Sequence, residues 1–272
     1  MATITPIVPY RHGRMPDHRR FPADTMFVDD EGKGKKYALL KGVSAASTDY
    51  VWLMDDDVTI PDSAMSPLSD STDADLIILP LIMSEGDKSL LSRLQQTEYA
   101  AIQTLTLLSA ERGKPIMCSG ANMIVKRQCW LESAEDLHYD IPSGDDMFLL
   151  ESFKRRKLKI TARCEPCLLI EPQSNIRDLL RQRMRWAGKS PHYTDRDIIA
   201  CGVAVLLINL FSLLIPPLWL LKFCLELSLL SYGRKNYNLS PHTSVFVALL
   251  LSLIYPIYIL ISLFGGLFSR KW

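Results

Sequence analysis

The sequence predicts an α/β domain followed by helices that are embedded in a membrane. One observation is a short apolar run, Tyr50–Met54, which has the pattern of a buried strand and leads directly into three carboxylates, Asp55 to Asp57. Another is the pair of long apolar runs Ile198–Leu221 and Val245–Phe268, because about 20 apolar residues are enough for a helix to cross a bilayer. The chain of 272 residues is long enough for one sizeable α/β domain and a smaller part.

The N-terminal part is expected to form two strands and a helix. Ile4–Pro9 is a short apolar strand candidate, and Asp24–Val28 is a second one that ends at Asp29 and Asp30. A polar, basic loop of fewer than about twenty residues joins the two candidates. Tyr37–Ala46 then places its apolar residues on one face of a helix.

A glycine–lysine loop, Gly32 to Lys36, opens this predicted helix. Free N–H groups and the helix dipole at an N-terminus favour anions, so the loop is suited to bind phosphate. It lacks the spacing and the terminal Ser or Thr of a Walker motif, so an ATP-type P-loop is not supported. Taken alone, such a motif is more often a surface turn.

The acidic triplet stands where an open α/β sheet binds its ligands, beyond the carboxyl end of a strand. Two carboxylates at positions i and i+2, such as Asp55 and Asp57, can hold a hard divalent cation, which in turn can hold a diphosphate. The alternative is that Asp55 to Asp57 are solvated turn residues, since Asp favours turns.

The middle of the chain alternates between strand and helix patterns. Small residues at 119–121 would let the backbone approach a ligand closely. The expected elements are a loop at Ser63–Asp75, a strand at Leu76–Met83 interrupted by Pro80, a helix at Ser89–Ala110, a strand–turn–strand at Pro115–Lys126 with strands Ile116–Cys118 and Met123–Val125, a helix at Met147–Phe153, and short strands at Leu158–Ala162 and Leu168–Ile170.

Two further stretches are rich in functional side chains. Asp145 and Asp146 precede the helix at Met147, where acids also serve as ordinary capping residues. Asn175–Trp186 is a helix pattern in which Gln182, Arg185 and Trp186 share one face.

Three arginines of that helix, at 177, 181 and 185, form one basic stripe. Such a stripe either pairs with anionic lipid head groups or holds a diphosphate leaving group while the tryptophan stacks on an acceptor sugar. The sequence leaves both interpretations open.

Composition excludes other classes of function. The net charge is +1, so no overall field favours nucleic acid. Cys164 and Cys167 form one C-x-x-C without a second pair or a histidine at ligand spacing, which argues against a zinc site.

Taken in order, these stretches resemble the family 2 glycosyltransferases of the GT-A type, and especially the membrane-attached branch with cellulose, chitin and hyaluronan synthases. The resemblance covers about residues 10–186. Four motifs carry it: Gly34-Lys35-Lys36-Tyr37-Ala38-Leu39 with Gly42, the strand-terminal Asp55-Asp56-Asp57, Gly144-Asp145-Asp146, and Gln182-Arg183-Met184-Arg185-Trp186.

The resemblance implies a Rossmann-like GT-A domain at residues 1–190 and a membrane domain of two or three helices at 191–272. It implies inverting transfer of a sugar from a UDP- or GDP-sugar to a lipid or polysaccharide acceptor, with Mg²⁺ or Mn²⁺ as the cofactor. The implied site residues are Asp55 and Lys35 for the donor, Asp57 with Asp55 for the metal, Asp146 as general base beside Asp145, and Gln182, Arg185 and Trp186 for the acceptor and diphosphate.

The N-terminal half departs from the family pattern, because a full strand–helix–strand unit normally stands where this chain has the basic loop. Asp30, with Asp29, is then either the uracil-contacting acid of the donor site or a loop residue. The shortened half also suggests an alternative function, a membrane-tethered partner subunit with weak or no catalysis. More basic residues flank the first apolar run than the loop after it, which places the catalytic domain in the cytoplasm.

Overall fold

The computed structural model describes residues 3–61, 73–85, 88–239 and 244–268, and the predicted loop at 63–75 lies mostly outside these ranges. The chain divides into two compact units. Unit 1 holds residues 1–81 and 106–170, and unit 2 holds 82–105 and 171–272. The predicted boundary between a transferase domain at 1–190 and a membrane domain at 191–272 stays a prediction.

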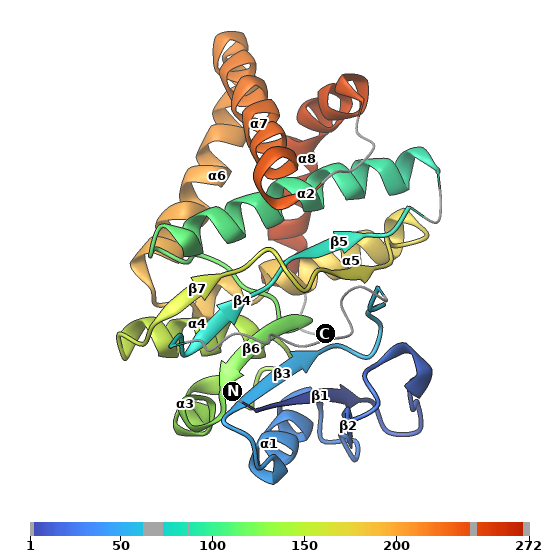
Figure 1. Cartoon of the computed structure of the whole chain (residues 1–272). Helices are drawn as coiled ribbons and strands as arrows, with labels where there is room; N and C mark the ends of the chain where they lie inside the picture. Colours follow the sequence, from blue (N-terminus) through green and yellow to red (C-terminus); the bar gives the residue numbers. More distant parts are fainter. Residues whose placement is uncertain (1–2, 62–72, 86–87, 240–243, 269–272) are drawn as a thin grey trace. The chain divides into compact units, whose positions relative to one another are not determined.

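Unit 1 is built on a mixed six-stranded sheet of order β2-β1-β3-β6-β4-β7 (Figure 1). β1 pairs in parallel with β2 and β3, β4 pairs in parallel with β7, and β6 runs antiparallel to both of its neighbours, β3 and β4. The strands are β1 (Ile4–Tyr10), β2 (Met26–Asp29), β3 (Tyr50–Met54), β4 (Leu76–Ile78), β6 (Asn122–Lys126) and β7 (Ile160–Ala162). This parallel-dominated α/β sheet confirms the predicted fold class.

The centre of the sheet is its most buried part, because β3 lies between β1 and β6. All five residues of β3 are buried, which explains their unbroken apolar run. The indole Nε1 of Trp52 donates to Oδ1 of Asn122 over 2.9 Å, so the neighbouring strand satisfies this buried polar group. A rigid strand therefore ends at the Asp55–Asp57 triplet.

Helices α1 (Lys35–Ala45), α3 (Arg127–Glu132) and α4 (Asp145–Arg155) also belong to unit 1. Gly42 lets α1 approach the sheet closely, since a Cβ there would lie 2.9 Å from side-chain atoms of Ile7 and Val28. The residues between β1 and β2 are all described, and they form a loop with one 3-10 turn, η1 (His18–Arg20). The compressed N-terminal connection expected from the sequence is therefore present.

Unit 2 is helical. It contains most of α2 (Leu90–Glu111), together with α5 (Ile176–Ala187), α6 (Arg196–Leu214), α7 (Pro216–Tyr237) and α8 (Val245–Phe268). Asn175 caps α5 by accepting from the backbone N–H of Asp178. α8 packs closely on α5, because a Cβ at Gly266 would lie 2.5 Å from the backbone oxygen of Met184.

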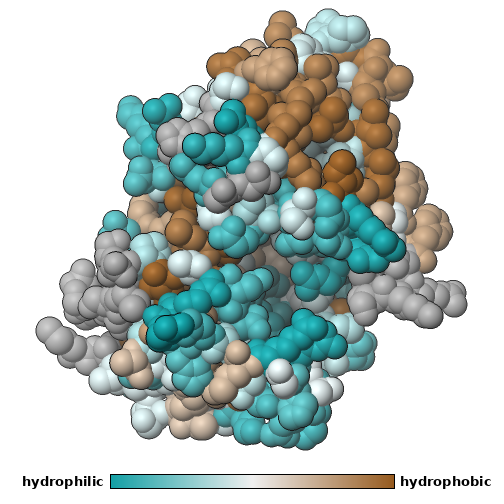
Figure 2. Space-filling view, turned by 90° about the vertical axis from the view of Figure 1, so that its right-hand side faces the viewer, coloured by the Kyte–Doolittle hydropathy of each residue, from teal (hydrophilic) through white to brown (hydrophobic). Residues whose placement is uncertain are grey.

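Two helices of the described residues, α6 and α8, are long and apolar enough to cross a membrane. Large apolar side chains on both are exposed, among them Leu207, Leu214, Ile257 and Phe264. Figure 2 shows the apolar surface that the C-terminal helices present. α7 begins at the predicted Pro216-Pro217 break, with both prolines in its first turn, where a missing N–H costs no hydrogen bond.

One strand prediction was wrong, and another is seen in more detail. Ile116–Cys118 is not a strand, because both edges of β6 are already paired with β3 and β4. The strand predicted at Leu76–Met83, with an interruption at Pro80, is present as two strands, β4 and β5 (Leu81–Met83). Pro80 lies between them and has no N–H to continue a ladder, while its carbonyl accepts from Nδ2 of Asn122.

Candidate active site

Lys35 joins three of the predicted motifs within unit 1. It is the first residue of α1, after Gly34, whose φ of 93° is in the left-handed region. Its ammonium Nζ lies 2.6 Å from Oδ1 of Asp55 at the end of β3, and 3.0 Å from Oδ2 of Asp145 at the start of α4. The lysine loop, the acidic triplet and the acid pair therefore meet at one point.

The two carboxylates keep Lys35 charged. Burial by itself would lower the pKa of Lys35, but the negative charges of Asp145 and Asp55 outweigh it and raise this pKa above its ordinary value. Asp145 is 8% exposed in its side chain, whereas Lys35 and Asp55 are 29% and 32% exposed. Of the two ion pairs that Lys35 makes, the one with Asp145 is thus more deeply buried than the one with Asp55.

The other two aspartates of the triplet carry less well compensated charge. Desolvation raises the pKa of Asp56 and of Asp57, and neighbouring carboxylates, first that of Asp55, raise both further. Arg20 holds the chain just after the triplet, with Nη2 donating to the oxygen of Val58 over 2.8 Å and to Oγ1 of Thr59 over 2.7 Å. The three neighbouring carboxylates, Asp55 to Asp57, therefore concentrate negative charge at the end of β3.

Two backbone N–H groups hold the carboxylate of Asp146. Its Oδ2 accepts from the N–H of Gly120 over 3.3 Å, and its Oδ1 accepts from the N–H of Met147 over 2.8 Å. Both acids lie in the first turn of α4, whose N-cap residue is Gly144, and the cap has no side-chain hydrogen bond. Asp146 is partly exposed.

Gly120 lies against all three side chains of this cluster. A Cβ added there would lie 2.9 Å from Oδ2 of Asp145, 3.0 Å from Nζ of Lys35 and 3.6 Å from Cβ of Asp146. The small residues at 119–121 therefore do allow a close backbone approach, and the groups approached belong to the site itself.

Sequence reasoning missed Lys36, which fixes the loop before α4. Its buried ammonium donates to the backbone oxygens of His138 and Ile141, over 2.7 Å in both cases. It also lies 5.0 Å from the ring centroid of Phe148. Only helix phase distinguishes the two lysines, so the tertiary structure had to decide which of them faces the aspartates.

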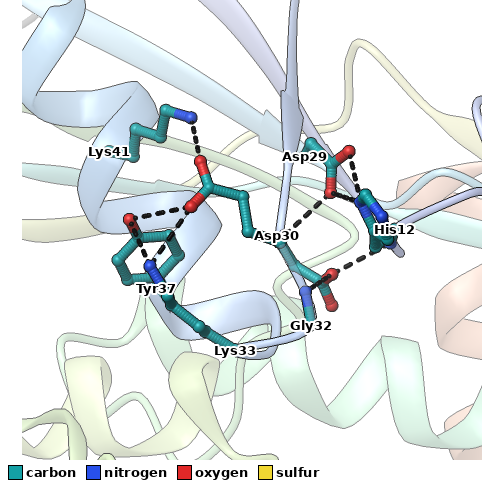
Figure 3. A network of polar contacts seen from close by, with 8 residues as sticks. His12, Asp29, Asp30, Gly32, Lys33, Tyr37 and Lys41 are labelled. Carbon is teal, nitrogen blue, oxygen red and sulfur yellow. Dashed lines mark hydrogen bonds and ion pairs between the residues drawn. The ribbon is translucent and has the colours of Figure 1, made fainter.

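Asp29 and Asp30 organise the turn after β2 (Figure 3). The buried Oδ1 of Asp30 accepts from the backbone N–H groups of His12 and Gly32, over 2.9 Å each. Nδ1 of His12 lies 2.9 Å from Oδ2 of Asp29. Asp30 therefore connects the end of β1 to the loop that leads to Lys35. This role agrees with the interpretation of Asp30 as a loop residue. A contact of Asp30 with the donor stays a prediction.

Glu31 extends this network to α1. Its carboxylate lies 2.6 Å from Nζ of Lys41 and 3.2 Å from Nζ of Lys33. These two lysines lower the pKa of Glu31 to about 2. The exposed cations of the loop are thus engaged with Glu31, while Lys35 alone of these lysines faces Asp55.

The fourth motif lies in unit 2, on α5. Arg177, Arg181 and Arg185 are exposed, so the predicted basic stripe is a solvent-facing surface. Gln182 and Trp186 are partly exposed. Arg183, which the sequence analysis did not single out, is 5% exposed in its side chain and pairs with Glu98 of α2. Its partner lies 85 residues away, so no local spacing could have revealed it.

Among the described residues, no three His, Cys, Asp or Glu side chains are gathered closely enough to hold a metal ion by themselves. A Mg²⁺-like ion bound through one or two carboxylates takes its remaining ligands from water and substrate phosphates. The clustered charge of Asp55, Asp56 and Asp57 fits that kind of site, since a cation there would relieve their mutual repulsion.

The model of the family described as "Glycosyltransferase like family 2" matches residues 18–189 of the chain. No curated protein matches the sequence. Among solved structures, the mannosyltransferase PcManGT from Pyrobaculum calidifontis, in complex with GDP-Man and Mn²⁺, is similar with a TM-score of 0.51 at 14% identity, over 98% of this chain and 88% of that one. At this identity the likeness shows the fold.

Two other structures are similar at lower scores. Glucosyl-3-phosphoglycerate synthase from Mycobacterium tuberculosis, with Mn²⁺ and UDP-glucose, has a TM-score of 0.38 at 17% identity and covers 68% of this chain and 77% of that one. Mannosyl-3-phosphoglycerate synthase from Rubrobacter xylanophilus has a TM-score of 0.37 at 15% identity and covers 68% and 71%. At these scores neither carries an argument.

Proposed function

Since the chain belongs to the glycosyltransferase-like family 2, we propose that it uses a divalent cation to transfer a sugar, with inversion, from a nucleotide sugar to an acceptor at a membrane. The observation that carries this proposal is the meeting of Lys35, Asp55 and Asp145 at the end of β3. It brings the ammonium group of a lysine, a carboxylate at the end of a strand and the acid pair of α4 to one place, although they are far apart in the sequence.

For the donor, we propose that Asp55 and Lys35 contact the nucleotide diphosphate and that Asp57, with Asp55, binds Mg²⁺ or Mn²⁺. When bound, the cation would neutralise the charge that develops on the departing nucleoside diphosphate. Asp30 holds the neighbouring turn in place, and we propose that it borders the nucleobase of the donor. The complex of PcManGT makes GDP-mannose with Mn²⁺ the first donor and metal to test, followed by UDP-glucose.

For the chemistry, we propose Asp146 as the general base. Gly120 and Met147 hold its carboxylate through backbone N–H groups, while its partial exposure leaves it accessible to an acceptor hydroxyl. Asp145 is paired with Lys35 and is the less accessible of the two acids. A base that removes the hydroxyl proton, with no protein nucleophile in the reaction, gives inversion at the anomeric carbon.

For the acceptor, Gln182, Arg185 and Trp186 of α5 are proposed to hold its end and the leaving diphosphate. A lipid acceptor is favoured over a growing polysaccharide, because among the described residues two helices meet the requirements for crossing a membrane, which is few for a polymer-conducting channel. The excess of basic residues before α6 supports the proposal that the catalytic part lies in the cytoplasm.

The decisive experiment is a donor screen on purified membranes that reads release of nucleoside diphosphate with and without Mn²⁺. We expect release from one of the donors, dependent on metal and lost in Asp57→Ala. Product in the organic phase of an extraction supports a lipid acceptor, and product retained in a water-soluble polymer contradicts it.

One structural feature favours a second candidate, a membrane-tethered subunit that binds donor weakly. The connection between β1 and β2 is a loop with a single 3-10 turn, so less structure is present near the nucleotide than the family normally has. Calorimetry with GDP-mannose, UDP-glucose and Mn²⁺ separates the candidates. Absence of binding to either donor, together with absence of turnover, would favour the subunit.

A further inference from the structure

A buried ion pair fixes α5 from inside unit 2. Nη2 of Arg183 donates to Oε2 of Glu98 over 2.8 Å, and its Nε donates to Oε1 over 3.4 Å. The two side chains are 5% and 6% exposed. Tyr258 of α8 adds a third partner, with its hydroxyl donating to Oε2 of Glu98 over 3.4 Å. Three helices, α2, α5 and α8, are thus joined at one carboxylate.

The same guanidinium touches two residues proposed to hold the acceptor. Its Nη1 donates to Oε1 of Gln182 over 2.5 Å, and its Cζ lies 4.1 Å from the ring centroid of Trp186. A planar guanidinium can make a forked contact with a carboxylate and stack on an aromatic face at the same time, which an ammonium group cannot do. Gln182 and Trp186 therefore take their orientation from Arg183.

The backbone of α5 is also held where these side chains begin. A Cβ at Gly265 of α8 would lie 2.5 Å from the methyl carbon of Met184, and one at Gly266 would lie 2.8 Å from the backbone nitrogen of Gly188. The close approach fixes the helix axis, and the ion pair fixes the rotation of the side chains. Together they leave Gln182 and Trp186 little freedom.

We propose that Arg183, held by Glu98 and Tyr258, is a positioning residue that sets the orientation of Gln182 and Trp186 for transfer to the acceptor. The inference rests on the proposed function for the role of those two residues, but the orientation itself can be measured without turnover. A structural ion pair that only stabilises unit 2 would leave the orientation of Trp186 and the rate per folded molecule unchanged once an apolar pair replaced it.

The test is the double variant Glu98→Leu/Arg183→Met, which removes both charges together. Replacing a whole buried ion pair by apolar residues of similar size is often tolerated, whereas removing one partner leaves an unpaired buried charge. The matched control is Lys222→Met/Glu226→Leu. That pair, 2.6 Å apart, joins two residues of α7, and its lysine is 3% exposed; neither residue contacts Gln182 or Trp186 in the described structure.

Two measurements are made on full-length protein in detergent. The first is fluorine NMR after labelling the five tryptophans with fluorotryptophan, with the Trp186 signal assigned by its loss in Trp186→Phe. The second is release of nucleoside diphosphate from GDP-mannose and UDP-glucose with Mn²⁺. We expect the Trp186 signal to shift in the test variant and not in the control, and kcat to fall by about 10²-fold because small misplacements have large effects on rate.

An unchanged Trp186 signal in the folded test variant would overturn the inference, and so would an unchanged kcat in an active enzyme. If the wild type releases no nucleoside diphosphate, the proposed function fails, and the fluorine signal alone decides on positioning. If the double variant does not fold, Arg183→Lys is used with the same readouts; it keeps the charge but lacks the planar fork, and an unchanged signal there overturns the inference equally.

Discussion

The ammonium group of Lys35 lies 2.6 Å from the carboxylate of Asp55, across the junction between the start of α1 and the end of β3. The same group lies 3.0 Å from Asp145. One lysine thus offsets part of the repulsion among carboxylates that would otherwise oppose one another at the end of the sheet. In the proposed function, a divalent cation and the diphosphate of the donor would enter a site whose charges are already partly balanced.

Replacing Lys35 tests this balance. Lys35→Met leaves Asp145 buried without its cation, and we expect a loss of about 1–3 kcal/mol in the free energy of unfolding. Turnover should fall more than the folded fraction does, because Asp55 also loses its partner. Urea unfolding and nucleoside diphosphate release measure the two effects. Lys33→Met is the matched control, since Lys33 makes an exposed pair with Glu31 and should change either quantity little.

The base assignment predicts a rate effect with little effect on the donor. Asp146→Asn keeps the size of the side chain and can keep one of the two contacts, because its single amide oxygen can accept from Met147 or from Gly120. The amide cannot act as a base, so kcat should fall by about 10²–10⁴-fold. The Kd for the nucleotide sugar, measured by calorimetry, should stay near that of the wild type. Retention of full turnover in this variant would remove Asp146 from the mechanism.

Gly120 predicts a steric effect inside the site. In Gly120→Ala the new methyl group would meet Asp145 at 2.9 Å and Lys35 at 3.0 Å, so both must move, and turnover should fall by at least about tenfold. Gly202→Ala is the control, because a Cβ at Gly202 on α6 meets nothing within 4 Å. Equal activities of the two variants, measured per folded molecule, would contradict the close approach at Gly120.

The raised pKa of Asp57 predicts how metal binding changes stability with pH. The pKa of Asp57 in the folded state lies above its ordinary value of 3.8. Such a group stabilises the folded state at pH values below 3.8, and this stabilisation is lost as the pH rises through the folded-state pKa. Mn²⁺ should relieve the resulting repulsion, so the rise in Tm caused by Mn²⁺ should be small near pH 4 and larger near neutral pH.

Two variants check the assignment of this effect to Asp57. In Asp57→Asn the increase in Tm with Mn²⁺ at neutral pH should shrink. In Asp73→Asn it should stay as in the wild type, because Asp73 is an exposed residue whose pKa is lowered by Lys159 and which takes no part in the site. A Tm response to Mn²⁺ that is the same in all three proteins would exclude Asp57 as a ligand.

Much of unit 1 could be predicted because local periodicity was strong. β3 has the predicted bounds, Tyr50–Met54, since a strand buried on both faces is apolar at every position. α4 carries Asp145 and Asp146 in its first turn, as its acidic start indicated. The strand expected at Ile116–Cys118 failed because pairing depends on which sheet edges are free, and a single segment does not contain that information.

The sequence by itself determined the α/β class, the acidic end of β3, the membrane-length helices α6 and α8 and the order of the four motifs, since each depends on residues close together along the chain. Only the tertiary structure decided that Lys35 and not Lys36 faces the aspartates, that Gly120 lies against them, and that Arg183 is buried against Glu98. The reason is physical: these contacts join residues tens of positions apart, and which groups meet depends on how the strands and helices pack, which leaves no period in the sequence.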